Sequence, residues 1–199
     1  MAHASVPIKF HEFEIDDYTR CSAAKTKIVK YLSKIKEAYK RGIGLYLFGG
    51  RGLGKSLVEA IIVKEVLRKG YTARYTTLGE TVMMFGDGFY NREARDFYQK
   101  EVLQVDFLII DDIDKTFKSE KSNYVAAAFD QLIRTRCNEL LPTIVSSNKT
   151  QNDLFSQEDS FCASALSLLA EHLLGITFQG QDKRIKDISP QLKKDFFGE

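Results

Sequence analysis

The sequence predicts an α/β domain with a doubly wound, parallel sheet. Short apolar runs alternate with longer stretches of helical periodicity throughout the chain. A glycine-rich stretch, Gly49–Ser56, joins one of these apolar runs to the helical run that follows it. This strand–loop–helix order is the unit in which proteins commonly bind phosphate, so the fold class and a ligand class are predicted together.

The first half of the chain supplies a leader, two helices and two strands. Residues 1–20 form an extended leader, whose apolar side chains either line a base pocket or pack onto the core. Apolar residues recur at helical spacing from Ser22 to Arg41, with lysines on the other face, which we interpret as a solvated face rather than a DNA contact. Leu45–Phe48 is an apolar strand, Leu57–Lys69 a helix, and Tyr71–Thr77 an alternating, β-rich strand.

The second half continues the alternation. Residues 78–100 are expected to form two short helices, broken near Gly86-Asp87-Gly88. Val105–Ile110 is continuously apolar, as a buried parallel strand would be. The remaining elements are a helix over Asn123–Leu141 ended by Pro142, a strand over Thr143–Ser147, a helix over Phe161–Leu174, a strand over Ile176–Phe178, and a polar tail over 179–199.

Composition narrows the function classes. The net charge is only +2, so any contact with nucleic acid must come from a local patch. Cys21, Cys137 and Cys162 show no C-x-x-C spacing, which argues against a disulfide framework or a zinc site and favours a reducing, cytoplasmic location. We expect no membrane contact, because there is no signal peptide and no apolar run approaches a membrane-spanning length.

The glycine-rich stretch fits the phosphate-binding pattern G-x-x-x-x-G-K-[ST]. Backbone N–H groups can wrap a triphosphate only where no Cβ intervenes, and the following helix directs its positive end at the phosphates. Lys55 is expected to reach the β- and γ-phosphates of ATP or ADP, and the Ser56 hydroxyl to ligate Mg²⁺. The expected nucleotide contacts are Gly49, Gly50, Arg51, Gly52, Leu53, Gly54, Lys55, Ser56 and Leu57.

Two further strand ends carry polar side chains. Asp111 and Asp112 follow the buried run Phe107–Ile110, where Asp111 would help to hold Mg²⁺ and Asp112 would polarise the attacking water. Asn148 follows Thr143–Ser147, where its amide would lie between these acids and the γ-phosphate. The alternative interpretation is ordinary turn chemistry at a strand end. Asp114 and Lys115 are assigned to the following loop.

With these motifs the chain resembles the DnaC/DnaI-type helicase loaders and the related IstB transposition ATPases, which are AAA+ proteins. The resemblance runs from about Phe13 to about Arg184, through the GKS motif, Ile109-Ile110-Asp111-Asp112-Ile113, and Ser147-Asn148. It implies a five-stranded parallel sheet in the order 5-1-4-3-2, with Lys55 and Ser56 as Walker A, Asp111 and Asp112 as Walker B, and Asn148 as sensor 1. It also implies assembly around single-stranded DNA or a helicase ring.

The sequence departs from this family pattern in two places. Loaders carry a separate N-terminal helicase-binding domain, whereas we divide this chain into a leader and helix, 1–41, and an ATPase domain, 42–199. The family also places an arginine finger in the helix before the last strand, where this chain has Leu168. Arg136 or Arg184 would have to replace it, or a partner would supply it; Arg184 also lies where a second sensor is expected.

The resemblance implies an Mg²⁺-dependent ATPase that loads a replicative DNA helicase and associates with itself. Residues 78–100 resemble the helical insertion of initiator and loader ATPases, so Arg92, Arg95 and Lys100 are candidates for contacting the phosphates of single-stranded DNA. Three alternatives stay open: an IstB-like transposition-targeting ATPase, a small-molecule kinase, and an assembly scaffold with little hydrolysis. Scarcity of arginine in the C-terminal half argues against the kinase.

Overall fold

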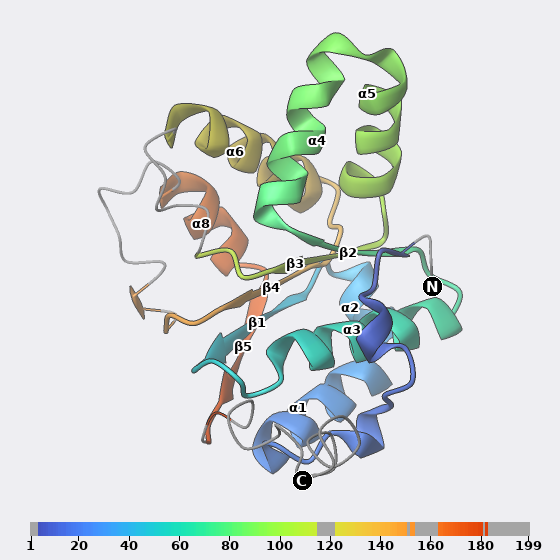
Figure 1. Ribbon diagram of the computed structural model, residues 1–199, viewed down its shortest axis with the longest axis vertical. Coiled ribbons are helices and arrows are strands. Elements are labelled where there is room, and N and C mark those ends of the chain that lie inside the picture. Colours follow the sequence, from blue (N-terminus) through green and yellow to red (C-terminus); the bar gives the residue numbers. More distant parts are fainter. Residues whose placement is uncertain (1–3, 115–121, 151, 154–162, 181, 183–199) are drawn as a thin grey trace, which may run out of the picture.

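The computed structural model describes residues 4–114, 122–150, 152–153, 163–180 and 182. A parallel sheet crosses the centre of the molecule in the order β2-β3-β4-β1-β5 (Figure 1). This is the predicted order, 5-1-4-3-2, counted from the other edge, and it confirms the fold class. The strands are β1 (Gly44–Gly49), β2 (Ala73–Thr77), β3 (Phe107–Asp111), β4 (Thr143–Ser147) and β5 (Leu173–Phe178).

Helices cover both faces of the sheet. The α-helices of the described residues are α1 (Ser22–Ser33), α2 (Ile35–Lys40), α3 (Lys55–Arg68), α4 (Leu78–Tyr90), α5 (Arg92–Tyr98), α6 (Ser122–Asn138) and α8 (Ala163–Ala170). Single helical turns occur at η2 (Ile8–Phe10) and η3 (Ile15–Asp17), and η4 (Gln99–Leu103) is a π-helical turn. The leader, expected to be extended, therefore contains two short turns.

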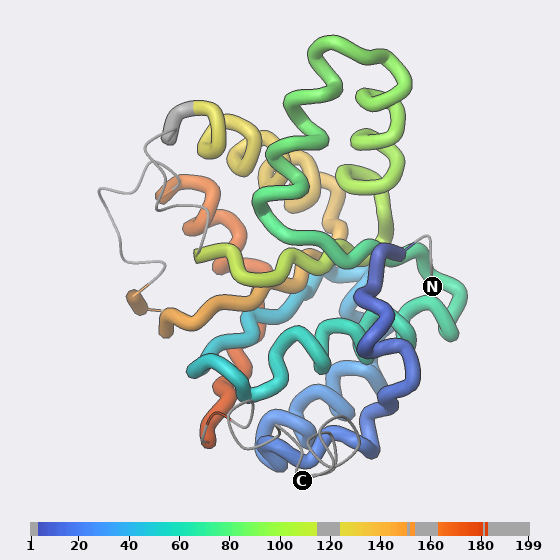
Figure 2. The backbone as a smooth tube through the Cα atoms, viewed as in Figure 1, coloured from blue at the N-terminus to red at the C-terminus, as the bar shows by residue number. Residues whose placement is uncertain are grey.

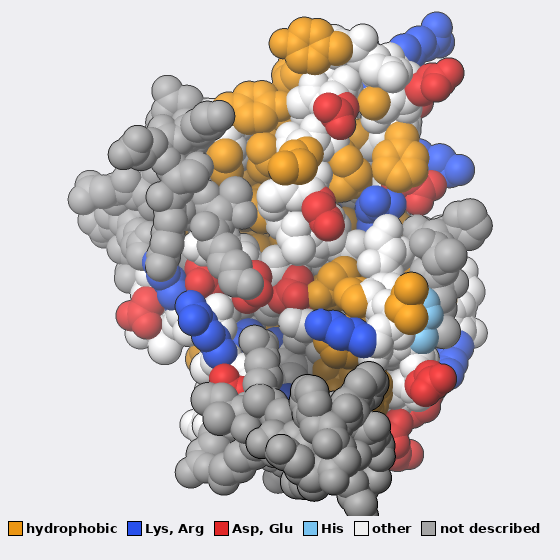
Figure 3. Space-filling model, viewed as in Figure 1, with side chains coloured by type: hydrophobic (Ala, Val, Ile, Leu, Met, Phe, Trp, Pro, Cys, Tyr) orange, Lys and Arg blue, Asp and Glu red, His pale blue; other side chains and the backbone are white. Residues whose placement is uncertain are grey.

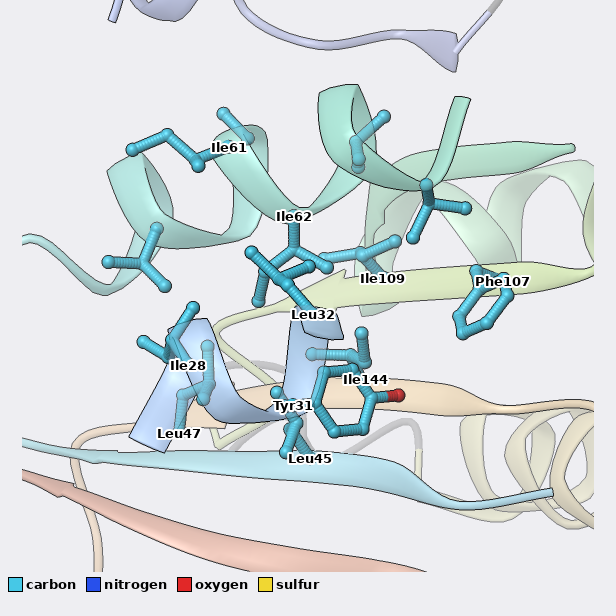
Figure 4. Packing of buried hydrophobic residues seen from close by; sticks show 14 of the residues in the cluster. Ile28, Tyr31, Leu32, Leu45, Leu47, Ile61, Ile62, Phe107, Ile109 and Ile144 are labelled. Carbon is cyan, nitrogen blue, oxygen red and sulfur yellow. The ribbon is translucent and has the colours of Figure 1, made fainter. Parts of the chain in front are cut away.

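Alternation along the strands divides the core into two apolar clusters. Leu45, Leu47 and Ile109 point toward α1 and α3, where they meet Ile28, Ile61 and Ile62 (Figure 4). Tyr46, Leu108, Ile110 and Val145 point to the opposite face, toward α4, α6 and α8. Successive side chains of a strand face opposite sides, so both faces of a central parallel strand must be apolar. This is why the strands read as continuous apolar runs.

The α4–α5 hairpin differs from the prediction in where it breaks. α4 continues through Gly86 and Gly88, and the break falls at Asn91, whose side chain caps α5 by accepting from the N–H groups of Glu93 and Ala94. A Cβ at Gly88 would lie 3.3 Å from the Arg95 Cα, so this glycine allows close helix packing. The glycine cluster therefore serves packing, and an Asn cap sets the boundary.

Other helix boundaries were also wrong; the helix predicted over Asn123–Leu141, for example, ends at Asn138. The predicted helix over Ser22–Arg41 is interrupted at Lys34, which has φ −108° and ψ 22°, so α1 and α2 are separate. The predicted helix over Phe161–Leu174 ends at Ala170, and Leu173 and Leu174 instead begin β5. Leu173 pairs with Gly44 of β1 and fills the core, so tertiary pairing overrides the helical pattern there.

Arg136 is a structural residue and cannot replace the arginine finger. It is fully buried on α6, and its guanidinium donates to Thr143 Oγ1 and to the carbonyl oxygens of Val102, Leu103, Val105, Asp106 and Pro142. These acceptors lie in the segments leading into β3 and β4. A planar guanidinium with five donors can satisfy many carbonyls at once, so Arg136 joins these segments and is not available to a nucleotide.

Within the described residues, no helix is both long enough and apolar enough to cross a bilayer.

Candidate functional site

The loop between β1 and α3 is shaped by glycines at left-handed backbone positions. Gly52 and Gly54 have φ angles of +72° and +87°, a region that disfavours residues with a Cβ. A Cβ at Gly54 would also lie 2.9 Å from the Tyr18 ring. α3 begins directly afterwards, at Lys55, so its first N–H groups have no partner within the helix and can receive an anion.

A cavity of about 700 Å³ opens beside this loop. It brings together the predicted residues Arg51 to Leu57 with Asp111, Asp112 and Asn148, although these come from three strand ends distant in sequence. Among the described residues, its wall also contains Pro7, Lys9, Phe10, Phe13, Arg20 and Tyr75. Gly49 and Gly50 are not part of this wall; their carbonyl oxygens instead accept hydrogen bonds from Lys55.

Lys55 is held by the protein at the centre of the site. Its ammonium donates to Gly49 O at 2.7 Å, Gly50 O at 2.9 Å and Asn148 Oδ1 at 3.0 Å. Burial lowers the pKa of Lys55, while nearby carboxylates, Asp112 foremost and Asp111 as well, oppose this shift. The ammonium thus lies among carboxylates in a partly desolvated site, where its attraction to phosphate is stronger than in water.

Asp111 is held by side chains from both neighbouring strands. Tyr75 on β2 donates to its Oδ2 at 2.5 Å, and Ser146 on β4 donates to its Oδ1 at 2.7 Å. Burial favours a raised pKa, but the hydrogen bonds from Tyr75 and Ser146, among others, outweigh burial and lower the pKa of Asp111. Asp111 is therefore ionised at neutral pH, as a ligand for a divalent cation must be.

Glu59 lies on α3 close to Asp111 and is fully buried. Neither of its carboxyl oxygens has a hydrogen-bond partner among the residues that the structure describes. Burial, reinforced by the charge on Asp111, raises the pKa of Glu59 well above its ordinary value. Two adjacent carboxyl groups in an apolar interior separate their pKa values in this way, so Asp111 carries the charge and Glu59 the proton.

Asn148 hydrogen-bonds to two acids that follow β3, Asp112 and Asp114. Its side chain accepts from Lys55 and donates to Asp112 Oδ1 at 3.4 Å, while its N–H donates to Asp114 Oδ1 at 3.2 Å. Asp114 also accepts from Ser147 at 2.8 Å, so its side chain organises the end of β4. Asp114 therefore positions Asn148, a role that assignment to a loop did not predict. Asp112 has φ +54°, an uncommon angle for an aspartate outside a turn.

The leader closes one side of the cavity. Tyr18 donates to Leu53 O at 3.0 Å and Arg20 donates to Gly52 O at 2.8 Å, so both hold the glycine-rich loop. Phe10 and Phe13 line the cavity, and Phe10 also packs against the apolar core. Side chains of the leader thus both line the cavity and pack onto the core, and a base bound against this wall stays a prediction.

Charged residues of α3 anchor the leader. The chain before α1 runs beside α3 in Figure 2. Lys64 is buried and donates to the carbonyl oxygens of His11, at 3.1 Å, and Phe13. Glu14 accepts two hydrogen bonds of 2.7 Å from Arg68, and these lower the pKa of Glu14 to about 2. The helix α3 therefore carries Lys55 at its N-terminus and, in its last two turns, the residues Lys64 and Arg68 that hold the leader against the cavity.

Several predicted residues lie outside the cavity. Leu168, at the expected arginine-finger position, is partly buried against the cluster between α6 and α8. Arg92 and Lys100 are exposed on the hairpin, each within ion-pair distance of a carboxylate, whereas Arg95 Nε donates to Gly88 O at 2.9 Å and joins α5 to α4. Arg184 and Lys115 lie outside the described residues.

Sequence reasoning missed Tyr75, Ser146, Glu59 and the Glu14–Arg68 pair. Tyr75 and Ser146 occupy alternate positions in strands that were predicted, but nothing in a single sequence shows that both point at Asp111. Glu59 had one signal: a charged residue inside the otherwise apolar run that follows the GKS motif. A buried acid three residues after Ser56 has to lie near the phosphate site, since one helical turn separates them.

The residues present fit a nucleotide with Mg²⁺. The loop offers N–H groups and Lys55 to phosphates, and Ser56 and the ionised Asp111 are oxygen ligands of the kind that Mg²⁺ takes alongside phosphate oxygens. No cluster of three or more His, Cys, Asp or Glu side chains suited to a metal occurs in the described part of the chain.

Sheet order and loop geometry together define a P-loop NTPase of the AAA+ class. The sequence profile of the family described as IstB-like ATP binding protein matches residues 1–189. The chain belongs to this family.

Individual relatives agree with this assignment. Over 153 residues the chain is 27% identical to the replicative helicase loader DnaI of Bacillus subtilis (strain 168), a match covering 73% of this chain and 45% of DnaI. The chain thus spans less than half of that relative. Similar folds include the DnaC helicase loader (TM-score 0.71, 18% identity, 87% of this chain and 100% of that chain). The initiator DnaA bound to AMPPCP and single-stranded DNA also has a similar fold (TM-score 0.68, 15% identity, 97% of this chain and 57% of that chain).

Proposed function

We propose that the chain is an Mg²⁺-dependent ATPase module that acts in loading a replicative DNA helicase. The observation that carries the proposal is the convergence of Lys55, Ser56, Asp111 and Asn148 on one cavity beside the glycine-rich loop. The similarity to the DnaI loader supports the helicase as partner. We also propose that copies of the chain associate, as in the assemblies implied by the family resemblance.

Each site residue has a distinct task in this proposal. Lys55 and the loop N–H groups bind the β- and γ-phosphates, while Ser56 and Asp111 hold Mg²⁺, which neutralises the charge that develops during hydrolysis. Asp112 orients the attacking water, and Asn148 fixes Asp112 relative to Lys55. Phe10 and Phe13 contribute an apolar wall for the base. Arg184 stays a candidate for a second sensor.

Binding of a fluorescent ATP analogue and release of phosphate test the proposal separately. Lys55→Ala is expected to abolish nucleotide binding, whereas Asp112→Asn is expected to keep binding and lose turnover. Co-purification with the host's replicative helicase, compared with a transposase, separates the loader from the IstB-like alternative. Nucleotide binding that persists in Lys55→Ala contradicts the assignment of the site.

Leu168 favours a second candidate, a nucleotide-dependent scaffold with little hydrolysis. An arginine finger contributes several orders of magnitude to phosphoryl transfer, and α8 offers a leucine side chain at the expected position. Comparing ATP turnover of the Leu168→Arg variant with that of the parent protein therefore tests this candidate. If the missing guanidinium limits the reaction, this variant hydrolyses ATP faster than the parent protein in the assembled state. Equal turnover in both proteins, at a high rate, argues against the scaffold.

The proposed contact with single-stranded DNA rests on Arg92 and Lys100 more than on Arg95, because Arg95 already holds the two helices of the hairpin together. Replacing Arg92 and Lys100 by alanine and measuring affinity against salt concentration tests it. Loss of phosphate contacts is expected to reduce the salt slope by about one per contact. An unchanged slope removes these residues from the DNA interface.

A further inference from the structure

Among the described residues, four basic side chains line the cavity beside the glycine-rich loop: Lys9, Arg20, Arg51 and Lys55. Three of them already have partners in the protein. Lys55 donates to three oxygen atoms, Arg20 donates to Gly52 O, and the Lys9 ammonium lies 4.8 Å from the centre of the Phe10 ring. Each of these three cations therefore contacts the loop or the leader itself.

Arg51 is the exception in this set. It is exposed in the middle of Gly50-Arg51-Gly52, and it makes no hydrogen bond or ion pair within the described part of the chain. Figure 3 shows that basic and acidic side chains lie side by side across the middle of this face, beneath the hydrophobic surface of the α4–α5 hairpin. A guanidinium presents a planar set of N–H donors that fits a phosphate group through two parallel hydrogen bonds. Arg51 is thus available to an anion in the cavity.

Hydrolysis of ATP creates a need for a guanidinium at the γ-phosphate. Negative charge develops around the transferred group, and an arginine commonly neutralises it in enzymes of this chemistry. Leu168 occupies the expected position of that arginine and does not line the cavity, and Arg136 is fully buried on α6. Arg51, by contrast, belongs to the phosphate-binding loop. It lines the same cavity as Asp112 and Asn148, the residues assigned to the attacking water and the γ-phosphate.

We propose that Arg51 donates to the γ-phosphate during hydrolysis and supplies, from within the same chain, the positive charge that Leu168 cannot supply. The oxygen of the attacking water bonds to the γ-phosphorus, the bond from that phosphorus to the bridging oxygen breaks, and ADP leaves with the electron pair. The proton of the water passes by way of Asp112 to solvent. Arg51 keeps its own protons throughout and stabilises the charge on the γ-phosphate oxygens as it develops.

This role goes beyond the nucleotide contact that the sequence predicted for Arg51. An arginine that only bound the nucleotide would stabilise bound ATP and its transition state equally, so its loss would change affinity without changing turnover. An arginine that acted on a neighbouring copy would complete the site of that copy instead of its own. The inference rests on the proposed ATPase function and specifies which side chain completes the site.

Arg51→Ala and Arg51→Lys test this role, with Arg41→Ala as a matched control. Both positions are exposed and Arg41 does not line the cavity, so all three variants are expected to fold. Turnover of ATP with Mg²⁺ is expected to fall at least about a hundredfold in Arg51→Ala, while the affinity for ADP changes less than about threefold. In this variant, ADP with aluminium fluoride, a mimic of the transferred phosphoryl group, is expected to bind no more tightly than ADP alone. Arg51→Lys is expected to recover part of the turnover, and the control to match the parent protein.

A mixture of Arg51→Ala with Asp112→Asn decides whether the guanidinium acts within one chain. No chain in the mixture carries both residues, so turnover is expected to stay low, and recovery would assign Arg51 to a neighbouring copy and overturn the proposal. Unchanged turnover in Arg51→Ala, an equal loss of affinity for ATP and ADP with turnover kept, or a parent protein that binds ATP without hydrolysing it also overturns the proposal. Failure of the proposed function is recognised separately, because the parent protein then does not bind the fluorescent ATP analogue, or Lys55→Ala binds it equally well; the inference then fails with it.

Discussion

Replacing Glu59 by leucine is expected to stabilise the protein. The carboxyl group is fully buried and both of its oxygens lack hydrogen-bond partners among the described residues. Leaving a buried polar group unsatisfied costs about 1–3 kcal/mol, and leucine of similar size removes this cost while keeping the site filled. The free energy of unfolding should therefore rise by about 1–3 kcal/mol, with the melting temperature rising about 2–4 °C for each kcal/mol in a chain of this length.

Glu59 also makes stability depend on pH in a definite direction. Its pKa in the folded protein lies well above the ordinary value of 4.5 that applies in the unfolded chain. Between these two values the folded state binds one more proton than the unfolded state, so stability falls as pH rises, by up to about 1.4 kcal/mol per pH unit. Below pH 4.5 the group is protonated in both states and its slope vanishes.

Urea denaturation between pH 4 and 9 measures both effects, and Glu59→Gln separates them. Glutamine keeps a polar group in the buried position but cannot ionise. It should abolish the pH-dependent difference from the parent protein without the full gain in stability seen with leucine. Subtracting one protein from the other cancels the titration of groups that do not interact with Glu59; Asp111, which does, is already ionised over most of this pH range. Parallel stability curves for the parent protein and Glu59→Gln would refute the assignment of a raised pKa.

Three further predictions concern residues that support the site. Tyr75→Phe removes one hydrogen bond to an ionised carboxylate, worth about 1.5–3 kcal/mol, so Mg²⁺ should bind about ten- to a hundredfold more weakly in a titration of ATP turnover; an unchanged Mg²⁺ midpoint contradicts this. Glu14→Gln weakens the anchor of the leader, so limited proteolysis of the leader should accelerate and nucleotide affinity fall, while the urea midpoint changes little. Arg136→Met leaves several buried carbonyl groups without a donor, so the free energy of unfolding measured with urea should fall by about 3–5 kcal/mol. If it falls by less than the gain of about 1–3 kcal/mol that is expected for Glu59→Leu, water has taken the place of the guanidinium.

Local patterns predicted most of the fold. The strand β4 was predicted with its observed bounds, because Pro142 and the polar Asn148 delimit an apolar run. Errors occurred where contacts distant in sequence decide the structure. Leu173 and Leu174 continue a helical pattern, yet pairing with β1 draws them into a strand. Glycines at 86 and 88 suggested a break, although their small size serves packing against Tyr124 and Arg95.

In the site, too, local patterns were predicted and contacts between residues distant in sequence were not. The phosphate loop is contiguous, and its glycines, Lys55 and Ser56 are recognisable because one ligand dictates their spacing. Asp111 was predicted from the strand that carries it, but its partners Tyr75 and Ser146 come from two other strands whose order in the sheet had first to be known. Sequence order alone gives no sign that Glu14 meets Arg68, because no periodicity connects an irregular leader to a helix.

The hydrogen bonds of Lys55 have a consequence for which ligands the site accepts. Gly49, Gly50 and Asn148 already satisfy the three N–H donors of its ammonium. A ligand that recruits Lys55 must compete with these oxygens, so it gains only the difference between its own attraction and theirs. A triphosphate, which concentrates the most negative charge, is expected to compete better than a monophosphate, and a nucleoside offers no phosphate at all. Through Lys55 the site is therefore expected to favour nucleotides with more phosphates, whichever base they carry.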